Sequence, residues 1–199
     1  MKKAPIRIAI FASGGGSNAE AIMQHLQGSS SGEVVLVCTN KSTAGVLDRA
    51  KRFDIPTAVL PKTSYTDSQT LITLMEEHRI DLIVLAGYLK LIPEAFTRHF
   101  HKRILNIHPG LIPEFGGKGM YGMNVHKAVI EQQAPASGIT IHFVDDQYDH
   151  GMTILQHAIP VDPDWSPEEL SRKVLTIEHH WFPQIVVQVC NDLYQNSHA

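Results

Sequence analysis

Short, continuously apolar segments alternate along the chain with longer segments in which apolar residues recur every three or four positions. Segments of the first kind are typical of strands buried in a sheet, and those of the second kind are typical of helices with one buried face. The pattern therefore predicts strands and helices in alternation. The expected strands are Ile6 to Ala12, Val34 to Thr39, Ile55 to Leu60, Asp81 to Ala86, Ile104 to His108, Ile139 to Val144 and Thr153 to Val161.

Capping residues mark where the helices are expected to begin. The capping pairs are Ser17 with Glu20, Thr66 with Gln69 and Ser166 with Glu169, and Asn124 is expected to cap alone. The expected helices include Ala19 to Gln27, Ala44 to Phe53, one after Thr66, a short one to about Phe100, Asn124 to Gln133, and one from Ser166. Pro183 should kink or interrupt the last helix, because proline removes a backbone hydrogen bond.

This order predicts an α/β fold, with a Rossmann-like, mostly parallel sheet, helices on both faces, and a C-terminal antiparallel hairpin plus helix. A length of 199 residues fits one domain, residues 1–199. The net charge of -3 argues against a nucleic-acid surface as the main feature. Because neither a signal peptide nor a membrane-spanning run is evident, we expect the cytoplasm. Cys38 and Cys190 lie in apolar runs and are expected to be buried thiols.

Two polar side chains occupy the end of the fifth expected strand. Asn106 and His108 are separated by one residue, so both should project from the same face, and Pro109 ends the strand. Ligands of open α/β sheets bind at the carboxyl ends of strands. The pair is therefore either part of a binding site or a hydrogen-bonded polar pair, and these residues alone do not distinguish the two.

A glycine-rich loop, Ser13 to Asn18, follows the first strand. Its glycines let the backbone approach an anion, and N–H groups at the start of the next helix can bind one. We therefore favour a phosphate site on Gly16, Ser17 and Asn18 over a tight turn without a ligand. A dinucleotide is disfavoured, because the second strand ends in Thr39-Asn40-Lys41 rather than in an acidic residue that binds a ribose.

Aspartates and histidines raise two further possibilities. The loop between the last two strands carries Asp145, Asp146 and Asp149, which taken alone are more typical of solvated turns than of catalysts. A metal bound by these aspartates and nearby histidines is disfavoured, because no compact ligand spacing such as H-E-x-x-H occurs. The histidines concerned are His108, His126, His142 and His150.

Five motifs resemble, in their order, those of the folate-dependent formyltransferases, and the resemblance covers nearly the whole chain. They are Ser13-Gly-Gly-Gly-Ser-Asn18, Ala86-Gly-Tyr-Leu89, Asn106-Ile-His-Pro-Gly-Leu-Ile-Pro113, His142-Phe-Val144 and Asp149-His-Gly151. The glycine loop and the Glu178-His179 pair point to the phosphoribosylglycinamide branch. The resemblance implies transfer of a formyl group from 10-formyltetrahydrofolate to the amine of glycinamide ribonucleotide, a step of de novo purine biosynthesis.

The resemblance also implies a role for individual residues. Asn106, His108 and Asp149 take the catalytic positions. The nucleotide substrate falls on Gly16, Ser17, Asn18 and Glu178, and the folate falls on Leu89, Lys90, Leu91, Ile92, Asn106, Asp145, Asp146 and Asp149. The implied partners are these two small molecules, with no metal, nucleic acid or membrane, and a homodimer is left open. The departures are Gly110 in place of serine, His150 in place of glycine, Gln69 near an arginine position, and a longer loop from Gly116 to Met123.

The implied reaction fits the chemistry of the three catalytic candidates. Attack of an amine on a formyl carbon creates an oxyanion, which Asn106 and a protonated His108 can stabilise as hydrogen-bond donors. Asp149 should raise the pKa of His108 and can relay the amine proton through water. We therefore expect direct transfer without a covalent intermediate.

Three alternatives make different demands on the sequence. A methionyl-tRNA formyltransferase is expected to need a further C-terminal domain, and a formyltetrahydrofolate hydrolase an added N-terminal domain. A non-catalytic phosphate-binding module predicts a degraded triad, whereas Asn106, His108 and Asp149 are all present. The sequence therefore favours the phosphoribosylglycinamide branch.

Overall fold

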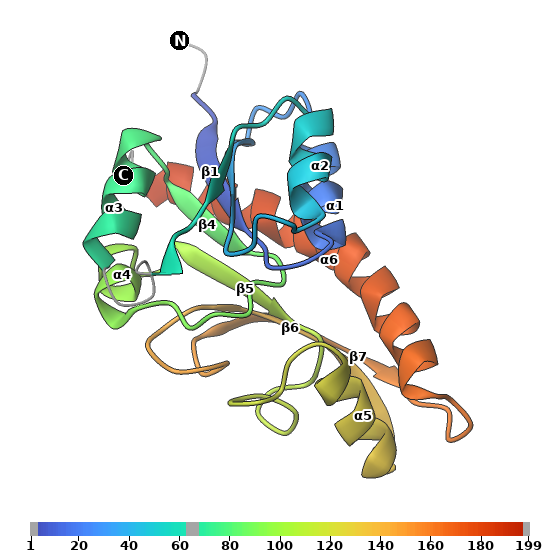
Figure 1. The fold of residues 1–199 in the computed structure, drawn as a ribbon. Coiled ribbons are helices and arrows are strands. Elements are labelled where there is room, and N and C mark those ends of the chain that lie inside the picture. The colour runs from blue at the N-terminus through green and yellow to red at the C-terminus, as the bar shows by residue number, and fades with distance from the viewer. Residues whose placement is uncertain (1–3, 63–67, 197–199) are drawn as a thin grey trace.

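The computed structural model describes residues 4–62 and 68–196. Within these residues seven strands form one sheet in the order β3-β2-β1-β4-β5-β6-β7, accompanied by six helices (Figure 1). The strands are β1 (Ile6–Phe11), β2 (Gly32–Thr39), β3 (Thr57–Val59), β4 (Leu82–Leu85), β5 (Ile104–His108), β6 (Ala136–Phe143) and β7 (Thr153–Pro160). The helices are α1 (Ser17–Leu26), α2 (Val46–Arg52), α3 (Ser68–Glu77), α4 (Glu94–His99), α5 (Met123–Glu131) and α6 (Pro167–Asn196).

The sheet is parallel from β3 to β5 and changes direction after that. β6 runs antiparallel to β5, and β7 runs antiparallel to β6. The α/β class, the mostly parallel sheet and the C-terminal hairpin are thus confirmed. Because of this reversal, a strand from late in the chain lies directly beside the carboxyl end of β5.

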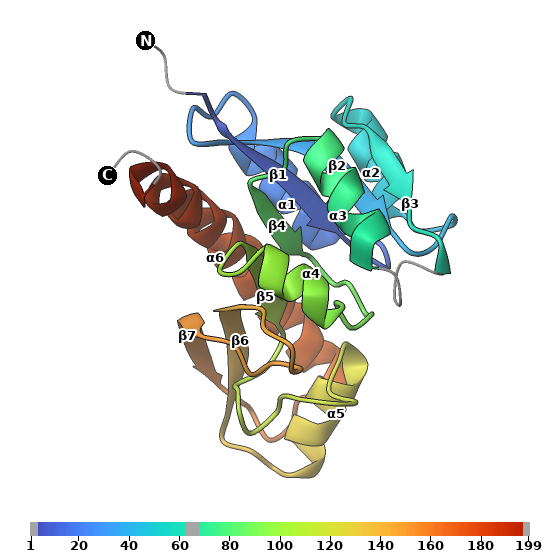
Figure 2. The same cartoon turned by 90° about the vertical axis from the view of Figure 1, so that its left-hand side faces the viewer.

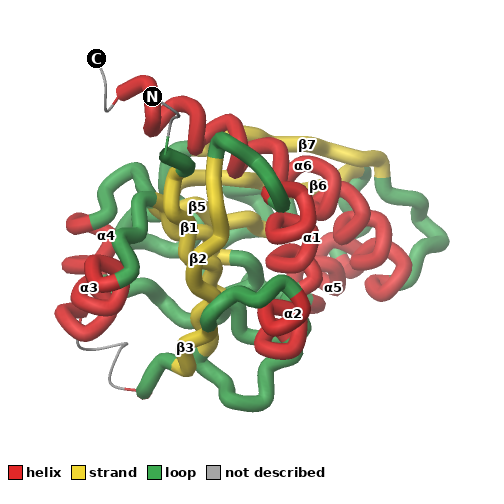
Figure 3. Tube along the Cα trace, turned by 90° about the horizontal axis from the view of Figure 1, so that it is seen from above, coloured by secondary structure: helices red, strands yellow, loops and turns green. Residues whose placement is uncertain are grey.

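Helices cover both faces of the sheet, as expected. α3 and α4 lie on one face, toward the viewer in Figure 2, and α1, α2, α5 and α6 lie on the other (Figure 3). The strands are buried from both sides, so Ile8 and Ile10 of β1 pack into the core under α1 and α6, while Ala9 and Phe11 pack under α3 and α4. The two cysteine thiols are buried, as the sequence predicts.

The capping box expected at the start of α1 is wrong. Gly16, with φ of 75°, occupies the N-cap position, and no side chain caps the helix. Ser17 is the first helical residue, and Glu20 forms ion pairs with Arg49 and Arg52 of α2 instead. Glycine replaces the cap because the chain enters the helix in the left-handed conformation, which favours glycine.

The cap expected from Asn124 is also wrong. α5 begins one residue earlier, at Met123, and the Asn124 side chain donates a hydrogen bond to the Gly119 carbonyl over 3.0 Å. This contact ties the preceding loop to the helix. Thr66, the expected cap of α3, lies outside the described residues.

The start of α6 is confirmed, but its interruption is not. Ser166 and Glu169 form a reciprocal capping box, with N–H to side-chain oxygen distances of 2.8 and 3.2 Å. α6 continues through Pro183 as one helix of 30 residues. Phe182 and Val186 on either side of the proline are fully buried, and this packing holds the helix together. None of the helices in the described parts of the chain is long and apolar enough to cross a membrane.

Candidate active site

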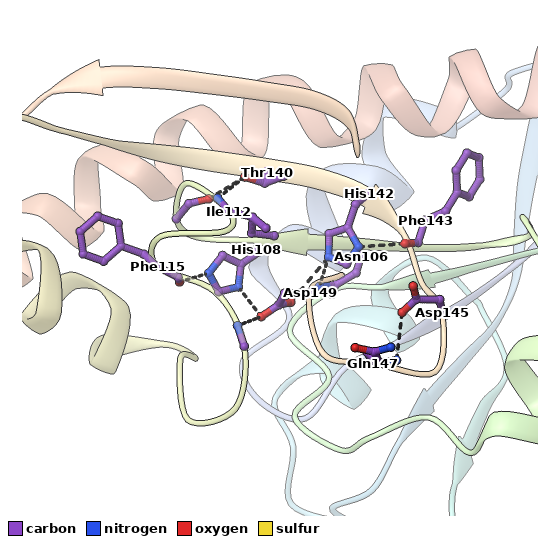
Figure 4. Close-up of polar contacts among 12 residues, drawn as sticks. Asn106, His108, Ile112, Phe115, Thr140, His142, Phe143, Asp145, Gln147 and Asp149 are labelled. Carbon is purple, nitrogen blue, oxygen red and sulfur yellow. Dashed lines mark hydrogen bonds and ion pairs between the residues drawn. The ribbon is translucent and has the colours of Figure 1, made fainter. Parts of the chain in front are cut away.

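β5 ends in the two polar side chains that the sequence marks as a candidate site. Asn106 and His108 share one face of the strand, and His142 and Thr140 of β6 stand opposite them in the antiparallel register. Figure 4 shows Asp149, from the loop between β6 and β7, reaching the same place. The structure therefore brings the three catalytic candidates together.

His108 is held by a backbone contact on one side and faces a carboxylate on the other. Its Nε2 lies 2.7 Å from the Phe115 carbonyl oxygen, so Nε2 carries a proton and donates it. Its Nδ1 lies 3.4 Å from Oδ2 of Asp149. The contact with Phe115 thus fixes which ring nitrogen is available at the site.

The charge of His108 differs from the expectation. Burial lowers the pKa of His108 and outweighs the opposing effects of the Asp149 charge and the Phe115 carbonyl. Asp149 thus raises the pKa of His108 as predicted, but the side chain is only 4% exposed, so desolvation dominates and the net shift is downward. His108 is neutral at pH 7, with an unprotonated Nδ1 toward Asp149.

Asp149 is an ionised carboxylate that accepts one backbone hydrogen bond and lies beside two histidines. The Gly117 N–H donates to its Oδ2 over 2.9 Å, and Nε2 of His142 lies 3.6 Å from its Oδ1. Burial would raise the pKa of Asp149, but its contacts with His142, His108 and Gly117 lower it below its usual value. The loop after β5 and the loop after β6 are therefore joined at this carboxylate.

The sequence indicates His142 only as a candidate metal ligand and as part of a motif, whereas the structure places it in the site. Its Nδ1 donates to the Phe143 carbonyl over 2.9 Å, so its Nε2 can accept a hydrogen bond from the Asn106 amide over 3.1 Å. The Asn106 NH₂ group retains a second N–H for a ligand. The alternation of polar residues along the β6 sequence could have predicted this role, had the register with β5 been known.

His126 of α5 is a further histidine beside His108. It is buried, and its Nδ1 has no hydrogen-bond partner among the described residues. Burial, together with repulsion from His108 when that residue is protonated, lowers the pKa of His126 to about 4. A buried neutral imidazole of this kind extends the wall of the site without adding charge. Among the described residues, no group of His, Cys, Asp and Glu side chains is arranged to hold a metal ion.

A cavity of about 650 Å³ opens at these residues. Of the residues assigned to the folate by resemblance, all except Asp146 line it. Asp146 is exposed outside this lining. The cavity continues to Asn18 and Glu178, so both expected ligand positions border one continuous space.

Asn18 and Glu178 meet at the wall of the cavity. The Asn18 side-chain N–H₂ donates to Oε2 of Glu178 over 2.8 Å. Burial raises the pKa of Glu178 to about 7, although the hydrogen bond from Asn18 acts in the opposite direction. Gly16 and Ser17 do not line the cavity themselves but precede Asn18 in the same turn.

The glycine turn is also tied to the expected folate segment. The Ser13 N–H donates to the Gly87 carbonyl, and the Leu89 N–H donates to the Ser13 hydroxyl, both over 3.0 Å. Ser13 is buried at 1% exposure. The loops after β1 and β4 therefore hold one another in place along the cavity.

Two departures from the resembling family have local explanations. A Cβ atom on Gly110 would lie 2.8 Å from Cγ1 of Val125, so a serine would require the Val125 side chain to move. His150 is exposed and its Nδ1 lies 2.8 Å from Oδ2 of Asp145, where the two side chains form an ion pair when His150 is protonated. The first departure concerns packing, and the second fixes one carboxylate at the rim of the cavity.

Known proteins resemble this chain along most of its length. The formyl transferase family matches residues 6–186. A chloroplastic phosphoribosylglycinamide formyltransferase of Arabidopsis thaliana is 44% identical over 94% of this chain and 66% of its own length. The corresponding Vigna unguiculata protein is 42% identical, over 61% of its length, so this chain spans a little less than two thirds of each plant relative.

Bacterial relatives match over nearly their whole length. The phosphoribosylglycinamide formyltransferase of Bacillus subtilis is 35% identical over 92% of this chain and 94% of its own. The crystal structure of such an enzyme from Anaplasma phagocytophilum has a TM-score of 0.86 and 32% identity, covering 94% of this chain and 88% of the other. Sequence and fold therefore agree on the same set of relatives.

Proposed function

Since this chain belongs to the formyl transferase family, we propose that it transfers a formyl group from 10-formyltetrahydrofolate to the amine of glycinamide ribonucleotide. The observation that carries the proposal is the convergence of Asn106, His108 and Asp149 on a cavity that also reaches Asn18 and Glu178. Such a cavity can hold two small molecules whose reacting groups meet at the triad.

Asn106 and His108 stabilise the oxyanion in this proposal. Asn106 donates its second amide N–H, because the first is used by His142. His108 must take a proton on Nδ1 from solvent water before it can donate, since Nε2–H is held by Phe115, and it returns that proton to water when the oxyanion collapses. The negative charge that develops on the formyl oxygen, together with Asp149, favours that protonation during the reaction.

Asp149 handles the proton that the reaction releases. The acceptor amine forms a bond to the formyl carbon and becomes an ammonium group, which must lose a proton. The carbon–nitrogen bond to the folate then breaks, and the departing folate nitrogen takes up a proton. The ionised Asp149 carboxylate relays this proton through water, so atoms and charges balance without a covalent intermediate.

The substrates are assigned to opposite ends of the cavity. The phosphate of the nucleotide binds the N–H groups of Gly16, Ser17 and Asn18, and its ribose hydroxyls bind Glu178, in keeping with an anion at the start of a helix. The folate lies along Leu89 to Ile92 and the Asp145 to Asp149 loop. Exposed Leu89, Leu91 and Tyr148 offer apolar contacts there.

No metal takes part in this mechanism, and the formylated folate is consumed as a co-substrate.

We retain the cytoplasm as the proposed location, whereas the names of the two plant relatives assign those proteins to the chloroplast. Formation of a homodimer is likewise a proposal.

The decisive experiment measures release of tetrahydrofolate with and without glycinamide ribonucleotide. We expect release only when the nucleotide is present, together with one equivalent of the formylated nucleotide by mass spectrometry. Release without the nucleotide would identify a hydrolase. No release under either condition would favour a binding module.

A further inference from the structure

The glycine turn before α1 is held from the side of α2. The Arg49 Nε–H donates to the Gly15 carbonyl over 2.6 Å, and the Val46 N–H donates to the Gly14 carbonyl over 3.2 Å. A Cβ on Gly45 would lie 3.4 Å from the Gly15 Cα, so the start of α2 packs closely on the turn. Two consecutive peptide carbonyls of the turn thus point toward α2.

These contacts determine where the N–H groups point. In a trans peptide the carbonyl and the following N–H lie on opposite sides, and Gly15–Gly16 is not a cis bond. With the Gly15 carbonyl directed at Arg49, the Gly16 N–H must point away from α2. The same reasoning directs the Gly15 N–H away from Val46.

The turn cannot fix this orientation through its own residues. Three consecutive glycines tolerate many backbone conformations, so either orientation of their peptides is accessible unless something outside holds it. Gly16 adopts φ of 75°, and a Cβ there would lie 2.5 Å from Cγ2 of Val46. Neighbouring groups on α2 therefore impose the conformation.

We propose that Arg49 is a positioning residue for phosphate recognition, because it holds the Gly15–Gly16 peptide with its N–H directed away from α2. Successive backbone N–H groups in such a turn form a concave site for an anion. This inference rests on the proposed function, which assigns the phosphate to this turn. Arg49 itself need not touch the phosphate.

Glu20 holds Arg49 in the required position. Its carboxylate pairs with Nη1 of Arg49 and, at 2.7 Å, with Nη2 of Arg52. Arg52 is more exposed, at 61% against 28% for Arg49, and makes no described contact with the turn. Arg52 is therefore a matched control, since it shares the charge and the partner but not the contact with Gly15.

The test compares Arg49→Met and Arg49→Lys with Arg52→Met in steady-state assays. We expect both Arg49 variants to raise KM for glycinamide ribonucleotide about tenfold, as for loss of a charged hydrogen bond, with kcat and the folate KM unchanged. With the dephosphorylated acceptor as substrate, the Arg49 variants and the wild type should have the same kcat and KM. Arg52→Met should match the wild type throughout.

A second measurement does not depend on turnover. Titration of inorganic phosphate into the isotope-labelled protein should shift the Gly16 amide resonance at the same phosphate concentration in the wild type and in Arg52→Met, and only at about tenfold higher concentration in Arg49→Met. This result would stand even if no formyl transfer were found, so the inference and the proposed function can fail separately.

Several results would overturn the inference. If Arg49→Lys kept the wild-type KM for glycinamide ribonucleotide, the positive charge at this position would be sufficient and the Nε–H contact with Gly15 would not be needed. An equal loss on phosphorylated and dephosphorylated acceptors would make Arg49 a general structural residue. A Gly16 resonance that responds to phosphate equally in all three proteins would remove Arg49 from phosphate recognition.

Discussion

Burial controls the charges of the individual side chains at this site. It raises the pKa of Glu178 and lowers that of His108, in each case favouring the neutral form. Asp149 is different, because its polar contacts outweigh burial and keep it ionised. The site thus places one firm negative charge beside an imidazole that resists protonation until the substrate develops charge.

Replacement of His108 tests the oxyanion assignment. His108→Ala removes a donor to the developing oxyanion, and kcat should fall about 100- to 1000-fold, as for other such donors. The measurement is steady-state kcat at pH 7.5, with His101→Ala on an exposed loop as the control. Near wild-type turnover in the His108 variant would rule out this assignment.

The buried Glu178 side chain should lower the free energy of unfolding at neutral and alkaline pH. Its pKa rises from 4.5 to about 7 on folding, so between these values the unfolded chain loses a proton that the folded chain keeps. Stability from this group is therefore present at low pH and is lost as pH rises through 7. Glu178→Gln should match the wild type near pH 4.5 and be more stable by about 3 kcal/mol at pH 8.

Chemical denaturation at the two pH values checks this prediction. Glu131→Gln, at an exposed position on α5, serves as the control. The same Glu178 variant should bind glycinamide ribonucleotide more weakly if the carboxylate contacts the ribose. A stability gain that did not change with pH would show that Glu178 is not desolvated as the structure indicates.

At the scale of elements, the ends of the helices explain what could and could not be read from the sequence. Strand and helix positions follow from apolar periodicity, and Ser166 with Glu169 capped as predicted, because both partners are local. Glu20 failed as a capping residue because its partners Arg49 and Arg52 come from another helix. Such contacts between distant segments cannot be inferred from local spacing.

The start of α1 allows a direct test of the phosphate position. Gly16 is unsuitable, since its backbone conformation and Val46 exclude a side chain. Gly15 has open space around its Cβ position, so Gly15→Asp adds a charge without a clash. Repulsion of the phosphate should raise KM for glycinamide ribonucleotide about tenfold or more, with the folate KM unchanged.

Gly15→Asn is the matched control, because it has the same shape without the charge. Isothermal titration calorimetry with each substrate separately would supplement the kinetics. If Gly15→Asp and Gly15→Asn weakened the binding of both substrates equally, the turn would have only a structural role. If neither variant changed the affinity for either substrate, the phosphate would bind elsewhere in the protein.

At the scale of the whole molecule, the topology predicted the meeting of the loops after β1 and β5. Parallel strands place these loops at one edge of the sheet, and the cavity between Asn18 and His108 follows from that. The part played by His142 did not follow, because the register of an antiparallel pair depends on packing along the whole strand. The neutral state of His108 also required the fold, since burial is not visible in a motif.

Chelation tests the molecule as a whole. The proposed transfer uses only protein side chains and water, so activity should survive exhaustive dialysis against a chelator. Metal content by mass spectrometry would be measured in the same samples. Loss of activity that zinc restores would show that histidines of the site hold a metal.

Loops at the amino-terminal ends of the parallel strands, opposite the candidate site, offer positions for inserting another domain. The turn between α1 and β2 contains Ser30, which is exposed and lies at the opposite end of α1 from the glycine turn. A fluorescent domain inserted after Ser30 should therefore leave kcat and both KM values unchanged, as measured against the unmodified chain. The chain could in this way carry a reporter or be attached to a surface with its reaction site left accessible.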